Sequence, residues 1–135
     1  MQVVWRLPTR SQEFDQGPVV RQTAGGVTIF YDYELDVGGY AWNALEFDRI
    51  AAYRFTAADA CTVDQVKAYD RLEEVNDSPW IAELLVENRP PRVPDARHFR
   101  IYFDEIGCFE VAAARFEPRI NENPDFAPVK DWPGY

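Results

Sequence analysis

The sequence predicts an α+β domain, in which one or two short helices pack on one face of a mostly antiparallel β-sheet. Two pairs of segments alternate apolar and polar residues with a period of two, and each pair is joined by a turn that contains glycine. One further stretch carries helix-forming residues behind a helix start signal. A β-sandwich is the alternative, because the same strands could divide between two sheets.

The longest predicted element is a β-hairpin over residues 27–56. Apolar and polar side chains alternate along both of its strands, so one face of the hairpin is expected to lie on a core. A three-residue loop at residues 38–40 keeps the apolar side chains of the two strands on one face, whereas a two-residue loop mixes the faces. This register places Asp32 opposite Glu46.

The other face of this hairpin is acidic and is the predicted binding surface. Two unit charges ~5 Å apart in water repel by roughly 0.8 kcal/mol, so clustered carboxylates carry a cost. Aromatic side chains beside the acids fit a recognition patch, in which aromatic anchors have a charged surround. In the alternative interpretation the acids are merely solvated, and Trp42 packs under the tail or a helix. The predicted binding residues are Asp32, Glu34, Asp36, Tyr40, Trp42, Glu46 and Asp48.

Shorter elements precede and follow this hairpin. Residues 2–7 and 18–23 are predicted to be short strands. Thr62 and Gln65 have the spacing of a capping box, which predicts the start of a short helix. Residues 69–75 then favour a strand.

The clearest helix signal covers residues 78–88. Ser78 can cap this helix, and a proline follows at the first helical position, where its missing N–H costs nothing. Ile81, Leu84 and Leu85 are expected to form its buried stripe. A helix of this length is marginal alone, so it must dock on the sheet.

A second hairpin is predicted to join residues 97–104 to residues 108–117. The loop between them has three residues, with Gly107 at its left-handed third position. The corresponding register sets Phe103 opposite Phe109. Alanines in the second strand leave room for a helix to approach closely.

Residues 1–117 are expected to form one globular domain, since the chain is long enough for a single core. Residues 118–135 are rich in proline and are predicted to form an extended tail that packs on the same domain. Phe126 and Trp132 are the side chains expected to hold it there.

Composition limits the classes of partner. The net charge is −9, with 14 Lys and Arg against 23 Asp and Glu. Binding to nucleic acid or to anionic membranes needs clustered basic residues, so neither is predicted, and a basic protein is the partner that the charge permits. The first fifteen residues have no apolar segment of signal-peptide length, and no run approaches the ~20 apolar residues of a membrane helix. These features predict a cytoplasmic protein.

No catalytic residue, cofactor or metal site is predicted. A single histidine, His98, is taken to exclude both a catalytic triad and a two-histidine metal site, and it is expected to be an ordinary strand-edge residue. A zinc site that adds Cys61 and Cys108 is rejected, because the predicted register separates His98 from Cys108 by ~20 Å at the rise of a strand. Both cysteines are expected to be free thiols. Phosphate-binding glycine loops and a nucleophile-elbow motif are absent from the sequence.

Two functions follow as hypotheses. The first is a non-enzymatic acidic protein-binding domain, such as an inhibitor or immunity-type protein, which contacts a basic partner through the acidic hairpin face. The second is a small-molecule-binding or enzymatic domain with an aromatic pocket between sheet and helix. A deep pocket with convergent polar groups favours the second hypothesis, and a closed core with a flat acidic face favours the first.

Overall fold

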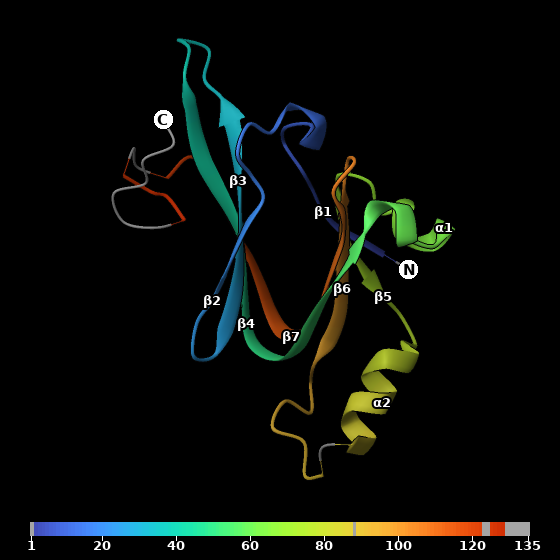
Figure 1. Ribbon diagram of the computed structural model, residues 1–135. Helices are drawn as coiled ribbons and strands as arrows, with labels where there is room; N and C mark the ends of the chain where they lie inside the picture. The colour runs from blue at the N-terminus through green and yellow to red at the C-terminus, as the bar shows by residue number, and fades with distance from the viewer. Residues whose placement is uncertain (1, 88, 123–124, 129–135) are drawn as a thin grey trace.

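The computed structural model describes residues 2–87, 89–122 and 125–128. In this part of the chain a seven-stranded antiparallel sheet carries two short α-helices, which confirms the α+β class (Figure 1). The spatial order of the strands is β1-β5-β6-β7-β4-β3-β2. The strands are β1 (Gln2–Arg6), β2 (Val19–Gln22), β3 (Gly26–Glu34), β4 (Tyr40–Ala57), β5 (Arg71–Val75), β6 (Arg97–Phe103) and β7 (Gly107–Arg119). The helices are α1 (Val63–Val66) and α2 (Pro79–Glu87), with 3-10 turns η1 (Ser11–Glu13) and η2 (Ala58–Ala60).

The long strands β4 and β7 curve, so that the sheet forms two arms with a space between them (Figure 1). One arm contains β2, β3 and the first part of β4, and the other contains β1, β5, β6 and the first part of β7. In β4 the pairing with β7 shifts between Ile50 and Ala52, beside Arg49, whose φ is 53°. An extra residue of this kind is a β-bulge, which bends a strand and increases its twist.

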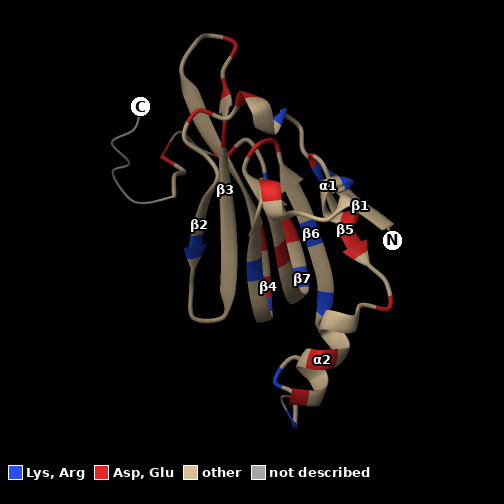
Figure 2. Ribbon diagram, turned by 45° about the vertical axis from the view of Figure 1, so that its right-hand side comes forward, with Lys and Arg blue, Asp and Glu red and all other residues tan. Residues whose placement is uncertain are grey.

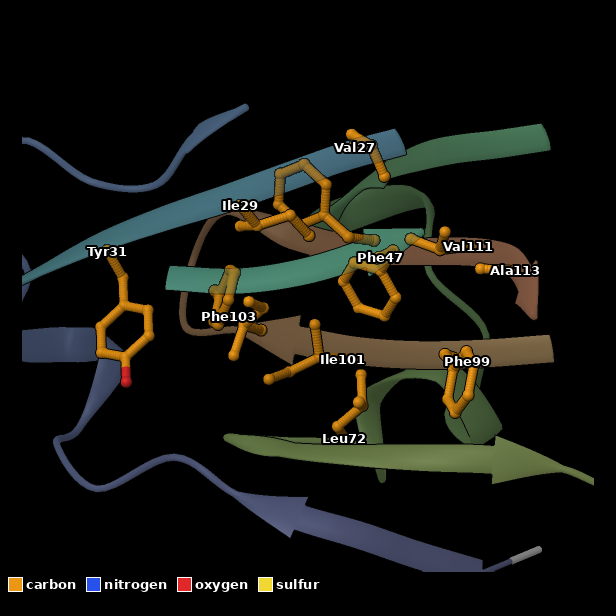
Figure 3. Packing of buried hydrophobic residues seen from close by; sticks show 12 residues of the cluster. Val27, Ile29, Tyr31, Phe47, Leu72, Phe99, Ile101, Phe103, Val111 and Ala113 are labelled. Carbon is orange, nitrogen blue, oxygen red and sulfur yellow. The ribbon is translucent and has the colours of Figure 1, made fainter. Parts of the chain in front are cut away.

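The core fills the space between the two arms (Figure 3). Its rings and branched aliphatic side chains come from strands of both arms and point toward one another. The rings of Trp5 and Phe14 lie 6.3 and 5.6 Å from that of Tyr31, so the N-terminal segment closes the open side. The buried members are Val27, Ile29, Tyr31, Leu45, Phe47, Leu72, Phe99, Ile101, Phe103, Phe109, Val111 and Ala113.

The first predicted hairpin is present, but its predicted three-residue loop is wrong. Glu34 pairs with Tyr40, and Asp32 lies opposite Trp42 instead of Glu46. The turn is therefore longer than predicted and covers residues 35–39, where the Leu35 N–H donates to the Gly39 carbonyl at 2.9 Å. The register differs by four residues, an even number, so the side chains of both strands as far as Asp48 stay on their predicted faces. At the bulge the prediction is wrong, because Ile50, expected on the outer face, packs against the core, and Ala51, expected on the core face, is exposed.

The second predicted hairpin is also present, with a register that differs by two residues. Phe103 pairs with Gly107 instead of Phe109, and Arg100 therefore lies opposite Glu110. The left-handed turn position belongs to Glu105, with φ 57°, and not to the glycine. Gly107 instead begins β7, where its φ of 143° and the close approach of β4 require glycine.

Both α-helices lie outside the same arm, on the face of the sheet opposite the core (Figure 1). The capping box of α1 is confirmed: Thr62 Oγ1 accepts the Gln65 N–H at 3.2 Å, and Gln65 Oε1 accepts the Thr62 N–H at 2.8 Å. Helix α2 begins and ends close to its predicted bounds. The stripe that was expected to be buried, Ile81, Leu84 and Leu85, is only half-buried, and no residue of α2 is fully buried.

The beginning of the C-terminal tail packs on the outer face of the arm that contains β2 and β3. The Phe126 ring lies 5.3 Å from the Phe30 ring, as predicted for one of the two anchoring aromatics. The other, Trp132, lies outside the described residues. Among the helices of the described chain, none has the length and apolar character needed to cross a membrane.

Candidate functional site

Asp32, the centre of the predicted acidic face, is fully buried. Its carboxylate accepts backbone N–H groups of Asp15 at 3.2 Å, Gln16 at 2.6 Å and Gly17 at 2.9 Å. The prediction that Asp32 is exposed beside Glu46 is therefore wrong. The carboxylate holds the loop that follows η1, and hydrogen bonds from several amides stabilise a buried negative charge.

We expect Asp32→Asn to lower the free energy of unfolding by about 2–3 kcal/mol, because an amide has one acceptor oxygen and brings donors toward other donors. Asp36→Asn is the control, since Asp36 is exposed at the hairpin turn and its replacement should leave stability unchanged. Urea unfolding of both variants measures the difference. Equal stability of the two variants would contradict this role of Asp32.

The middle of the predicted face is also covered. Trp42 is buried with Phe30 and Ala44 under the tail, as in the alternative interpretation of this residue. Glu46 is half-buried, and its carboxylate lies 3.9 Å from the Arg119 guanidinium. Asp48 is exposed but lies opposite Arg115 on β7. These residues do not form one flat acidic surface.

The other exposed acids of the predicted face, Glu34 and Asp36, lie at the end of the β3–β4 hairpin, which projects beyond the sheet (Figure 2). Two acids from near the N-terminus, Glu13 and Asp15, join Glu34 and Asp36 there. Partial desolvation is the largest cause of the raised pKa of the Tyr40 phenol, and the charges of Glu34, Asp15 and Glu13 raise it further. Val37 at the turn is 93% exposed. We call this surface the acidic tip; its residues are Glu13, Asp15, Glu34, Asp36, Val37 and Tyr40.

Sequence reasoning missed the two loop acids of the tip. Glu13 ends the 3-10 turn η1 and Asp15 lies in the loop after it, a stretch of sequence with no periodic pattern, so nothing local relates them to the hairpin. The amide hydrogen bonds to Asp32 bring this loop against β3. Only the closed fold therefore completes the tip.

A second polar site is a hydrogen-bonded chain between the sheet and α2. Ser78 Oγ lies 2.7 Å from His98 Nδ1, and His98 Nε2 lies 2.7 Å from Glu110 Oε1. The three residues are 8%, 5% and 2% exposed. The inference that one histidine excludes a triad is wrong, because a Ser–His–acid chain needs only one. His98 is not an edge residue either, since β6 lies between β5 and β7.

Glu110 is held as a carboxylate. Burial acts to raise its pKa, but hydrogen bonds from His98 and Arg54 outweigh burial and lower the pKa from 4.5 to about 2. Arg54 Nε donates to Glu110 Oε2 at 2.8 Å. An ionised carboxylate only accepts hydrogen bonds, so His98 Nε2 carries a proton, and in the neutral ring the Nδ1 lone pair faces Ser78.

Neighbouring elements lock this chain in place. Gln65 Nε2, from α1, donates to Glu110 Oε2 at 3.1 Å. The Trp80 ring meets the His98 ring edge-to-face at 5.0 Å, and the Arg54 guanidinium lies 4.2 Å from the Trp80 ring centre. The sequence contains a signal for Ser78 as a helix cap, but nothing local pairs it with His98 and Glu110.

Two surface hollows lie along α2, beside this chain. A hollow of about 480 Å³ has Ser78 and His98 in its wall, and a hollow of about 510 Å³ lies between α2, β4 and residues 89–96. Both are lined by Ile81, Leu85 and Ala96, so they adjoin. The sequence predicts an aromatic pocket between sheet and helix, but no Phe, Tyr or Trp of the described chain lines either hollow.

The cysteines lie near each other under α1 but have different surroundings. Cys108 is fully buried, and desolvation raises the pKa of its thiol to about 12, which disfavours the reactive thiolate. Cys61 is half-buried, and both are free thiols, as predicted. Within residues 2–87, 89–122 and 125–128, no group of three or more His, Cys, Asp and Glu side chains is arranged to hold a metal ion.

The chain matches no protein-family model, no curated protein and no solved structure. A fold class by itself does not define a function, so the functional proposals rest on the chemistry of these sites.

Proposed function

We propose that the protein is an acidic protein-binding domain that contacts a basic protein through the acidic tip, in the manner of an inhibitor or immunity-type protein of the cytoplasm. The observation that carries the proposal is the convergence of acids from two separate segments around exposed Val37 and half-buried Tyr40. An apolar and aromatic centre within a charged rim is the arrangement of many protein interfaces.

The charge of the whole chain supports the same partner class. At −9, the protein attracts cationic molecules over distances of about one Debye length, ~8 Å at physiological salt. Charges at a projecting tip are well placed to accelerate encounter with a basic surface. Such charges affect the rate of association more than the rate of dissociation.

The test is capture of basic proteins from an extract of the source cells by the immobilised full chain. A tip variant, Glu34→Gln with Asp36→Asn, is compared with Glu83→Gln and Glu87→Gln, a variant that removes the same charge from exposed positions of α2. We expect the wild type and the α2 variant to capture the same basic protein and the tip variant to lose it.

The kinetics of the captured protein complete the test. The tip variant should associate about tenfold more slowly, and its association rate should depend less steeply on salt concentration. Equal capture and equal association rates for the tip and α2 variants would refute the acidic tip as the contact surface.

A further inference from the structure

We propose that Ser78 and His98, with Glu110 as positioning residue, form a site that hydrolyses carboxylic esters with an apolar acyl chain. This activity is separate from the acidic tip. The observation behind it is the unbroken hydrogen-bonded chain of nucleophile, base and carboxylate, in which the nucleophile and the base, Ser78 and His98, lie in the wall of an open hollow.

The geometry meets the requirements of nucleophilic catalysis. A serine hydroxyl needs a base within about 2.6–3.2 Å, and a third group must orient that base. The Ser78–His98 and His98–Glu110 distances, both 2.7 Å, fall in this range. The order of the ring nitrogens is the reverse of that in chymotrypsin-like triads, but either nitrogen of a neutral imidazole can act as base once the other carries the proton.

The carboxylate is fixed more firmly than the rest of the chain. Arg54 binds both oxygens of Glu110, at 2.8 and 3.2 Å, and Gln65 adds a third hydrogen bond at 3.1 Å. Glu110 therefore stays in place when His98 gains and loses a proton. Its role is to orient His98 and to stabilise the imidazolium that forms.

Helix α2 supplies the stabilisation of the oxyanion. Ser78 stands immediately before the nine-residue helix, and Ile81 N–H reaches Ser78 Oγ at 3.3 Å. The first N–H groups of a helix have no acceptor within it, and they carry the positive end of the helix dipole. The N–H of Trp80, in this first turn, is the donor that we assign to the developing oxyanion.

The substrate class follows from the adjoining hollows. Beyond Ser78 and His98, the wall continues through Ile81 and Leu85 into the larger hollow, which Leu84 and other aliphatic side chains line. Ile81 and Leu85 lie in the wall of both hollows and Leu84 in that of the larger, so an aliphatic strip, which we call the trough, runs along α2. Charged side chains flank this strip in both hollows, among them Asp77, Arg97, Glu87 and Arg89. An acyl chain can lie in this trough, against Ile81, Leu84 and Leu85, with its carbonyl carbon at Ser78.

The reaction balances with water as the only co-reactant. Ser78 Oγ attacks the carbonyl carbon as its proton moves to His98 Nδ1, and the C–O bond to the alcohol breaks as the alcohol takes that proton. Water then attacks the acyl-Ser78 ester, gives a proton to His98, and releases the carboxylic acid as the proton returns to Ser78 Oγ. The products are one acid and one alcohol.

Covalent labelling tests the nucleophile directly. An alkyl fluorophosphonate forms a P–O bond with an activated serine and releases fluoride. We expect one adduct on the full chain by intact mass, and peptide mapping should place it on Ser78. Ser11, the other serine of the chain, is the internal control and should carry none. A folded wild-type protein without an adduct, or with its adduct elsewhere, overturns the proposal.

Hydrolysis of p-nitrophenyl esters tests the activity and the trough. Octanoate should be hydrolysed faster than acetate, and Ser78→Gly should lower kcat/KM for both by at least about 1000-fold. Glycine keeps most of the capping stability, and a thermal melt checks that the variant is folded. Leu85→Glu should lower the octanoate-to-acetate ratio. Activity that survives in Ser78→Gly, or equal rates for the two esters, refutes the corresponding assignment.

Discussion

Replacing Glu110 by glutamine is expected to lower the free energy of unfolding by about 3–5 kcal/mol, the usual cost of removing one partner from a buried ion pair. Glutamine has nearly the same shape, so the loss comes from charge and hydrogen bonding. The N–H groups of the new amide would point at Arg54 and Gln65, which are themselves donors. His98 would stay buried but would no longer face a carboxylate.

Glu117→Gln is the matched control. Glu117 lies on the same strand, β7, but is exposed and faces Glu46, so its neutralisation should change stability by less than about 0.5 kcal/mol. Urea unfolding at neutral pH measures both variants. A Glu110→Gln protein as stable as the Glu117→Gln protein would show that the buried chain adds no stability.

The pH dependence separates charge from packing. The pKa of Glu110 is lower in the folded protein, about 2, than its ordinary value of 4.5. A depressed pKa gives stability that is complete above pH 4.5 and is lost as pH falls toward 2, since the unfolded chain takes up the proton first. The stability difference between wild type and Glu110→Gln should therefore be largest at neutral pH and shrink below pH 4.5. A difference that is constant from pH 7 to pH 3 would indicate a packing defect.

Gly107→Ala is expected to destabilise the protein by about 3–5 kcal/mol, the combined cost of a strained backbone and a steric clash. With φ at 143°, Gly107 adopts a conformation that side chains disfavour. A Cβ at this position would lie 2.2 Å from the backbone oxygen of Thr56 and 2.9 Å from the Phe55 ring. The ring can move, but the carbonyl belongs to the β4–β7 pairing, so relief requires the strands to separate.

Gly25→Ala provides the control for the Gly107 variant. A Cβ at Gly25 would meet no atom within 4 Å, and its φ is outside the left-handed region. The same chemical change should therefore have an effect near zero, or slightly stabilise the protein by restricting the unfolded chain. Thermal unfolding of the two variants measures the difference. Similar melting temperatures would mean that β4 and β7 are not as close at Gly107 as the structure has them.

The candidate site could be predicted only in part. Exposed Glu34 and Asp36 were identified from alternation along the hairpin, because a period of two assigns side chains to faces, and half-buried Tyr40 was identified as an aromatic residue beside them. The same rule could not indicate that Asp32 is buried, because the loop that covers it comes from a segment without a pattern. Whether a polar residue on an outer face meets water depends on what packs over that face.

The sequence by itself determined the class of fold, the faces of both hairpins except at the β4 bulge around Ile50 and Ala51, and the starts of both helices. These are local properties: alternation assigns the faces, and the capping box at Thr62 and the Ser78-Pro79 pair mark where helices begin. The tertiary structure decided the strand registers, because a shift by two or four residues preserves every face and leaves the pattern unchanged. The contact between His98 and Glu110 depends on that register and on the packing of α2, so residues far apart in the sequence become one site only when the sheet has closed.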